Sequence, residues 1–225
     1  MPAWSSILLW WLAFAGSHLL LSSIPVRRPL IEKLGAQAFA GLYSVVALAT
    51  FVPIVWIYLD NCHSGPLLWT LRGVPGITAL TIVVGIVAFA LIAGSFAQPS
   101  ATSIDPRAVP RARGILRITR HPLFTGLALW GLGHVVVNGF ASDLAFFGSF
   151  AVFAVIGAQH QDTRKQLEEP QRLGAFYNET SLLPFGAVLE GRNRVVAEEM
   201  PWIALVLGAA VAGLVYLAHP WLFTP

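Results

Sequence analysis

The chain has 225 residues, of which 56% are hydrophobic and only 11% are charged, and its formal net charge is +3. An ordinary soluble domain carries about 25% charged residues, so this composition excludes a soluble globular protein and indicates an integral membrane protein. Its single cysteine, Cys62, excludes an internal disulfide, a multi-cysteine zinc site and an iron–sulfur cluster held by this chain alone. Because the basic residues lie in short loops beside apolar runs, they indicate membrane topology and lipid contact, and we expect no nucleic-acid partner.

Six apolar runs approach the length of roughly 20 residues that a helix needs to cross a bilayer. In chain order they cover about residues 4–23, 36–59, 76–96, 122–138, 144–159 and 202–219. The sequence therefore predicts an all-α integral membrane protein, a six-span transmembrane helical bundle that forms a single domain over residues 1–225. We expect the polar segment at 160–200 to cover the cytoplasmic side with short helices.

The runs also carry local signals for how the helices begin and pack. Pro122 suits the first turn of the fourth helix, where its missing N–H costs nothing. Only residues 139–143 separate the fourth run from the fifth, which predicts a tight helical hairpin with Ser142 or Asp143 as the N-cap. In the sixth run, Gly208 and Ala212 lie four residues apart and predict a helix-packing surface.

The positions of the basic residues predict the orientation in the membrane. Of the 14 Lys and Arg residues, 13 lie in the loop after the first run, the loop before the fourth, or the stretch before the sixth. Only Arg72 lies on the other side. Because basic residues concentrate in cytoplasmic loops, the sequence predicts that both termini are periplasmic.

Two histidines lie inside apolar runs, where ionisable side chains are costly and are candidates for function. These are His18 in the first run and His134 in the fourth. Phe14 lies one turn before His18, and Trp130 lies one turn before His134. An imidazole beside an aromatic wall is what a haem or another flat apolar ligand needs, although a hydrogen bond from each histidine to another helix or to the backbone explains the pattern equally well.

Helix geometry limits how the histidines could combine. His121 and His134 are 13 residues apart, about 220° around one helix and ~20 Å along it, so they cannot bind the same metal from a straight helix. His18 and His134 have an axial offset of ~12 Å, estimated from the rise per residue. That offset suits ligands on opposite faces of a macrocycle better than a compact zinc site.

A second group of candidate binding residues lies on the cytoplasmic side, before the fourth run. It consists of Arg117, Arg120 and His121, with Arg164 as a further candidate. Guanidinium groups here could hold haem propionates, a nucleotide-like cofactor or lipid phosphates. The simpler interpretation is that they set the topology and contact anionic membrane lipids.

Several of these residues occur in an order that resembles the NnrU family, and the resemblance runs over nearly the whole chain. The matching residues are His18 with Ser22 and Ser23, Arg27 to Pro29, Gly35, Leu42 to Ser44, Thr119 to Pro122, Trp130, Gly133 and His134, Asn138 and Gly139, Thr180 and Ser181, Pro184 and Phe185, and Gly191 and Arg192.

The NnrU resemblance implies a multi-pass protein of the bacterial inner membrane that is associated with denitrification, in particular with nitrite and nitric oxide reduction. Its partner would be a nitric oxide or nitrite reductase system or a lipophilic substrate. The same pattern is similar to the plant zeta-carotene isomerase family, which implies haem b and redox-dependent isomerisation of a carotenoid double bond. Carried over, the matching histidines are His18, His121 and His134, and the resemblance favours His18 and His134 as axial metal ligands. We expect Arg117 and Arg120 near the haem propionates.

Two other functions stay open. The stretch from Gly114 through His121 to Gly126 also resembles membrane methyltransferases that use S-adenosylmethionine, but this likeness covers less of the chain. Phe124 stands where those enzymes carry a tyrosine, and a methyltransferase gives no reason for His18 inside the first run. The other alternative is a non-catalytic accessory protein that assembles or stabilises a reductase.

Overall fold

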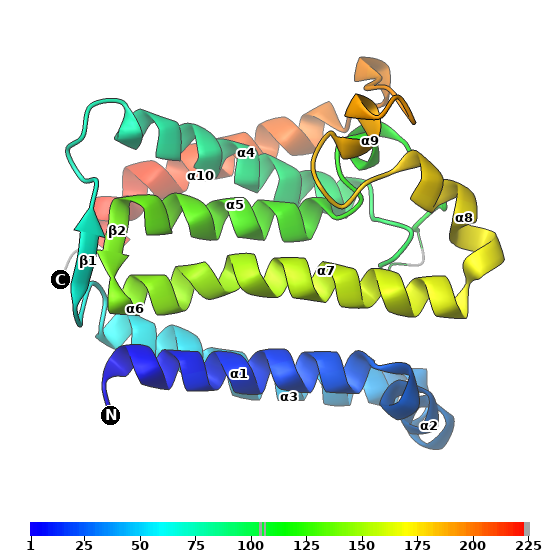
Figure 1. Ribbon diagram of the computed structural model, residues 1–225, viewed down its shortest axis with the longest axis horizontal. Coiled ribbons are helices and arrows are strands. Elements are labelled where there is room, and N and C mark those ends of the chain that lie inside the picture. The colour runs from blue at the N-terminus through cyan, green and yellow to red at the C-terminus, as the bar shows by residue number, and fades with distance from the viewer. Residues whose placement is uncertain (104, 106, 223–225) are drawn as a thin grey trace.

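The computed structural model describes residues 1–103, 105 and 107–222, and its fold is almost entirely helical (Figure 1). The long helices are α1 (Ala3–Ser22), α3 (Ala36–Asp60), α4 (Ile77–Ala97), α5 (Pro122–Val137), α7 (Ser149–Glu168) and α10 (Trp202–Leu222). The short ones are α2 (Ile24–Leu34), η1 (Gly114–Arg117), α6 (Ala141–Asp143), the π-helical turn η2 (Leu144–Gly148), α8 (Pro170–Glu179), α9 (Gly186–Leu189) and η3 (Ala197–Glu199). Two strands, β1 (Leu67–Thr70) and β2 (Asn138–Phe140), pair antiparallel.

Five helical segments are long and apolar enough to cross a membrane. They are Ala3–Ser22, Ala36–Asp60, Ile77–Ala97, Ala141–Glu168 and Trp202–Trp221. The fourth predicted run forms the apolar helix α5, whose 16 residues extend for about 24 Å, less than a hydrocarbon core of ~30 Å. The chain is therefore an all-α membrane protein with five candidate spans among its described residues, and each of the six apolar runs is helical as predicted.

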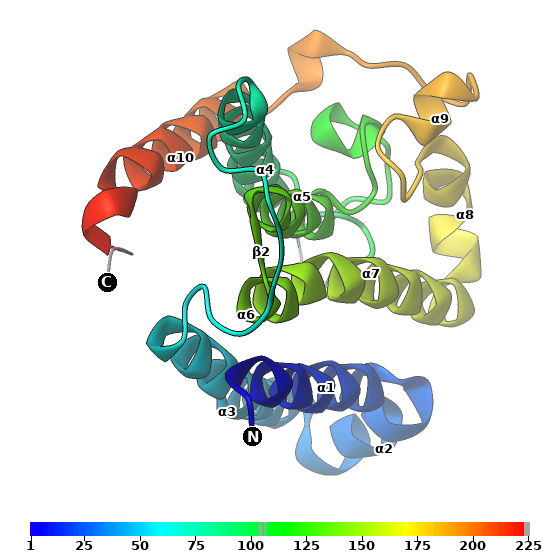
Figure 2. The ribbon, with the colours of Figure 1, turned by 60° about the vertical axis from the view of Figure 1, so that its left-hand side comes forward.

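The long helices pack side by side in the order α10, α4, α5, α7, α1 and α3 (Figures 1 and 2). This order differs from the order in sequence, because α7 lies between α5 and α1. The segment that contains α7 is also the most enclosed candidate span, with 44% of its most apolar stretch buried, whereas the others have 11% to 17%. A buried binding site is therefore best accommodated around α7, between α5 and α1.

The two ends of the bundle differ in charge and in composition. Helices α2, α8 and α9 gather at one end, and strands β1 and β2 lie at the other, where α1 begins and α10 ends (Figure 1). We call these the basic end and the strand end. The loops that carry 13 of the 14 Lys and Arg residues are at the basic end, and Arg72 follows β1 at the strand end. The two ends are thus separated in charge. Within residues 160–200, α7 continues to Glu168, and the short helices α8, α9 and η3 follow it.

The connection between α5 and α6 differs from the sequence-based prediction. Ser142 or Asp143 is predicted as an N-cap, but α6 already begins at Ala141, so this prediction is wrong. The chain instead forms β2, which pairs with β1 from a distant loop, and Gly139 lies directly against the main chain and ring of Trp69. A side chain at Gly139 would clash there, and the sequence carries no local signal for a strand pair of this kind.

Candidate functional site

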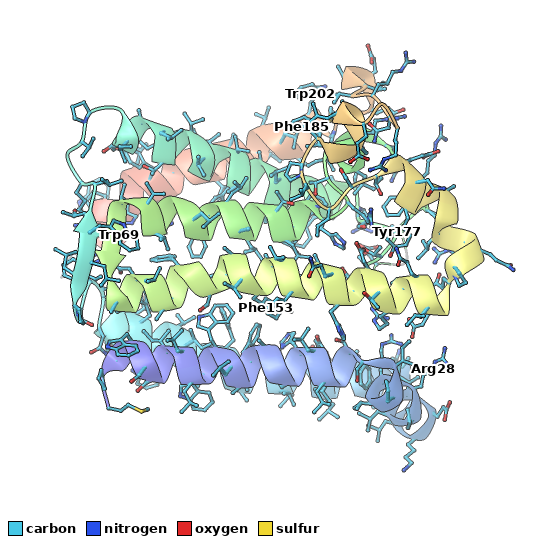
Figure 3. The ribbon with its side chains drawn as sticks, in the orientation of Figure 1. Arg28, Trp69, Phe153, Tyr177, Phe185 and Trp202 are labelled. Carbon is cyan, nitrogen blue, oxygen red and sulfur yellow. The ribbon has the colours of Figure 1, made fainter. Side chains whose placement is uncertain are left out.

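His18 lies on α1 among aromatic side chains from three helices. Its ring centroid is 4.1 Å from that of Phe14, 4.8 Å from Tyr43 of α3 and 5.8 Å from Phe153 of α7, and Figure 3 shows Phe153 between α7 and α1. Its Nδ1 is 3.1 Å from the carbonyl oxygen of Phe14. Because a carbonyl only accepts, Nδ1 carries the proton and donates. Nε2 has no hydrogen-bond partner among the described residues, so it is free to bind a metal.

His134 on α5 has the same arrangement. Its Nδ1 donates to the carbonyl oxygen of Trp130 over 2.9 Å, and its Nε2 has no hydrogen bond within the described part of the chain. The ring stacks on Phe147 of η2 with centroids 4.2 Å apart and an interplanar angle of 14°. A backbone carbonyl on one ring nitrogen fixes the tautomer and orientation of a metal-binding histidine, so each imidazole fits the role of a single axial ligand.

The side chains of η2 and α7 separate the two histidines. A series of ring contacts leads from His134 to His18 through Trp130, Phe150, Trp11 and Phe14, with successive ring centroids 4.1 to 5.4 Å apart. Helices α1 and α5 both pack on α7, which lies between them. The aromatic stripe that produces this packing recurs every three or four residues from Phe146 to Phe153.

The distance between His18 and His134 determines whether both could bind the same haem iron. Phe147, which contacts His134, and Phe153, which contacts His18, are six residues apart, or about 9 Å along the helix. Two ligands of one metal ion must each approach it to about 2 Å. Each histidine thus fits a haem separately, and binding of both to one iron requires the aromatic side chains between them to move. Among the described residues, no group of three or more His, Cys, Asp or Glu side chains could hold a metal ion.

Arg120 and His121 belong to a buried polar network at the basic end. His121 Nε2 donates to Asp162 Oδ1 over 2.8 Å, and Arg120 Nη1 donates to Asp162 Oδ2 over 2.8 Å. Arg120 also donates to the hydroxyl and carbonyl oxygens of Thr180, and its guanidinium lies 4.3 Å from the ring centroid of Tyr177. Figure 3 shows Tyr177 at the basic end. Because Nε2 of His121 is engaged, His121 is less suited than His134 to bind a metal.

Arg117 is held by a different carboxylate. Its Nε and Nη2 donate to the two oxygens of Glu199 over 2.7 and 3.0 Å, and the backbone N–H of Gly114 donates to the same carboxylate over 2.9 Å. These donors lower the pKa of Glu199 from 4.5 to about 2, with the Arg117 hydrogen bonds as the larger cause. Arg117 and Arg120 are thus brought to the basic end as predicted, but each already binds a carboxylate of this chain.

The site residues that the sequence-based prediction misses are mainly acids. Asp162 and Glu199 have no role in it, because they lie 42 and 82 residues from the arginines that they bind. The general need of weakly exposed basic residues for anionic partners predicts such acids but does not identify them. At the strand end, Asp143 is completely buried and accepts hydrogen bonds from Tyr58 and His63. No sequence pattern links these three residues, which lie as many as 85 positions apart.

Two surface hollows of about 460 and 500 Å³ lie at the basic end. The first is lined by Arg111, Ala112, Arg117, Glu179, Gly191, Arg192, Asn193 and Arg194. The second is lined by Arg120, Tyr177, Asn178, Thr180, Ser181, Leu182, Leu183, Gly186, Glu190 and Arg192. Neither includes His18 or His134, so the polar hollows and the histidines are separate features.

The chain is similar to two plant proteins that are each named 15-cis-zeta-carotene isomerase, chloroplastic. It is 31% identical over 221 residues to the protein of Arabidopsis thaliana, which covers 93% of this chain and 58% of the relative. It is 26% identical over 197 residues to the protein of Zea mays, which covers 83% of this chain and 52% of the relative. The chain thus spans somewhat more than half the length of these curated relatives.

No solved structure matches the chain. The sequence model of one family, described as NnrU protein, matches residues 6–225, which is nearly the whole chain. The chain therefore belongs to the NnrU family.

Proposed function

We propose that this chain is a haem b-binding isomerase of the bacterial inner membrane that acts on a lipophilic polyene. The observation that carries the proposal is that His18 and His134, each in an apolar helix, have Nδ1 bound to the backbone and Nε2 free. The similarity to the 15-cis-zeta-carotene isomerases over 93% of the chain supports the choice of reaction and substrate class. Because the chain spans only 58% of that relative, the activity is part of the proposal.

His18 and His134 would hold haem b through their Nε2 atoms once the aromatic side chains between them move, and the haem would supply redox chemistry. The residues around them have separate tasks. Phe14 and Phe153 exclude water at His18, and Trp130 and Phe147 do so at His134. These side chains make a site that favours an apolar polyene over a charged substrate.

The proposed topology follows from the charge distribution. With 13 of the 14 basic residues at the basic end, that end would face the cytoplasm and both termini the periplasm. This arrangement needs an even number of crossings, so α5 would also cross the membrane, in addition to the five longer segments. Its length of about 24 Å would be completed by β2 at one end and by the residues before Pro122 at the other.

An absorption spectrum of the protein, purified in detergent after expression with adequate haem, tests haem binding. We expect a Soret band that is lost or shifted in both His18→Ala and His134→Ala. His121→Ala is the matched control: it removes an imidazole bound to Asp162, so the band should shift less. Absence of the band in the wild type would refute haem binding, and equal loss in all three variants would refute the assignment of ligands.

Activity is tested with 15-cis-zeta-carotene in detergent or liposomes, under oxidising and reducing conditions, by chromatographic separation of the isomers. We expect conversion that depends on the redox state and is lost in His18→Ala and His134→Ala. Bound haem without isomerisation of this or related polyenes would contradict the isomerase proposal. It would favour the accessory role beside a nitric oxide or nitrite reductase.

A further inference from the structure

The contact region between α1, α3 and α7 near the basic end contains a buried arginine that is only partly paired. The side chain of Arg164 on α7 is 7% exposed, and its Nη1 donates to Glu168 Oε2 over 2.8 Å. Its Nε is buried and has no hydrogen-bond partner within the described chain. A buried donor on a charged group is costly when unpaired, so this N–H indicates that an acceptor from outside the chain belongs there.

A second unpaired nitrogen lies on the same face of α7, one turn earlier. Nε2 of His160 is buried and also has no hydrogen-bond partner among the described residues. The ring lies beside the main chain of Ser22 on α1, and the charge of Arg164 acts on both His160 and Tyr43 of α3. Two unpaired polar atoms therefore face one region that three helices enclose.

This region adjoins the surroundings of His18. Ser22 lies one turn after His18 on α1, and Tyr43 contacts the His18 ring at a centroid distance of 4.8 Å. Phe153, which also contacts His18, lies two turns before His160 on α7. A ligand here would meet polar groups at the basic end and an aromatic wall further into the bundle, which suits a molecule with one anionic end and an apolar body.

We propose that this region binds the carboxylate of a lipophilic ligand, with the Arg164 Nε–H as its donor. Guanidinium and carboxylate groups match in charge and geometry. If the ligand is haem b, the carboxylate is a propionate. Arg164 would then bind the propionate in place of Arg117 and Arg120, because those two arginines already form ion pairs with Glu199 and Asp162. The haem case rests on the proposed function, whereas a fatty acid would bind to the same Arg164 donor whether or not the protein binds haem.

Binding of acids and of their esters by the full-length protein in detergent tests this proposal. One pair of ligands is haem b and its dimethyl ester, followed by the Soret band, and the other is spin-labelled stearic acid and its methyl ester, followed by electron paramagnetic resonance. We expect the wild type to bind at least one acid more tightly than its ester. Arg164→Gln should weaken binding of that acid about tenfold, because a hydrogen bond to a charged group is lost, and leave the ester unchanged.

Two controls separate the donor role from structure. Glu168→Gln removes the ion-pair partner of Arg164 but keeps Nε, and Arg172→Gln removes an exposed cation from the same end, so neither should change the preference for the acid. Arg164→Lys supplies a second test where Arg164→Gln does not fold: it keeps the positive charge but removes the Nε–H donor, so it should also reduce the preference for the acid.

The outcomes separate this inference from the proposed function. A wild type without a Soret band that binds stearic acid in an Arg164-dependent way would refute haem binding and support the carboxylate site. A Soret band with equal affinity for haem and its ester, and no dependence on Arg164 for either acid, would refute the site and leave haem binding intact. If neither acid binds, both are refuted.

Discussion

Asp143 is the most completely buried acidic side chain described, with 0% exposure, and its surroundings fix its hydrogen bonds. Arg72 donates to Nε2 of His63 over 3.0 Å, and because arginine cannot accept, Nε2 is unprotonated and the His63 proton lies on Nδ1. Nδ1 then donates to Asp143 over 2.8 Å, and the hydroxyl of Tyr58 donates to the other carboxylate oxygen over 2.8 Å. The carboxylate thus ties α3, the loop that follows it and α6 together at the strand end.

Asp143→Asn should destabilise the protein by about 2 kcal/mol, because an amide offers one acceptor where two donors converge and leaves a buried group unpaired. The measurement is thermal unfolding in detergent. Asp60→Asn is the matched control: Asp60 is exposed at the same end and accepts from Trp56, so its replacement should cost less than about 0.5 kcal/mol. Equal destabilisation by both would contradict the role of the buried carboxylate.

The Arg117–Glu199 pair makes stability depend on pH. The pKa of Glu199 falls from 4.5 to about 2 on folding, so the pair stabilises the protein above about pH 4.5, and this stabilisation is lost as the pH falls toward 2. Glu199→Gln should therefore lower the unfolding temperature at neutral pH, and the difference from the wild type should shrink in acid. Glu198→Gln, which changes an exposed neighbour, should show no such trend. A difference that stays constant between neutral and acidic pH would contradict this prediction.

Some pairs of helices pack closely only because one helix carries a glycine, which has no side chain, at the point of contact. A Cβ at Gly126 of α5 would lie 2.7 Å from the carbonyl oxygen of Ala88 and 2.7 Å from a side-chain carbon of Ile92, both on α4. At Gly133, two turns later and facing the same helix, the nearest atom would be 3.6 Å away, which is an ordinary contact. The pair α4 and α5 therefore approaches closely at only one of these two glycines. Gly208 of α10 makes a similar close approach to α4, as the small residues in the sixth run predict.

Gly126→Ala should destabilise the protein by about 1–3 kcal/mol, because α4 or α5 must shift to make room. Gly133→Ala adds the same methyl group on the same helix and face and should be close to neutral or slightly stabilising. Thermal unfolding of the two variants, with circular dichroism as a check on helix content, compares them directly. Similar stability of the two variants would show that the contact between α4 and α5 yields easily.

For the whole molecule, the charge separation predicts a single orientation. In a Cys62→Ser background, Leu68→Cys places a thiol at the strand end and Leu189→Cys places one at the basic end, where these leucines are 58% and 85% exposed. A membrane-impermeant maleimide on intact cells should label Leu68→Cys, and Leu189→Cys only after permeabilisation. Labelling of both from outside, or the reverse pattern, would contradict the proposed topology.

The sequence predicts the candidate metal-binding histidines better than it predicts the acids that pair with the arginines. His18 and His134 are identifiable from sequence because an ionisable residue stands out within an apolar run. Asp162 and Glu199 are not identified as partners, because their pairing with Arg120 and Arg117 joins positions 42 and 82 residues apart. The two unpaired atoms at His160 and Arg164 are visible only once burial and hydrogen bonds are known.

By itself the sequence determined the six apolar helices and the charge difference between the ends, because hydrophobicity and basic residues act locally in a bilayer. Only the tertiary structure decided which helices are neighbours. The aromatic side chains from Phe146 to Phe153 pack on both sides of α7, and this places α7 between His18 and His134. Side-chain packing over many positions sets that order. The two histidines that the sequence suggests as a ligand pair therefore lie in separate surroundings, and beside His18 lies Arg164, whose Nε has no hydrogen-bond partner in the described chain.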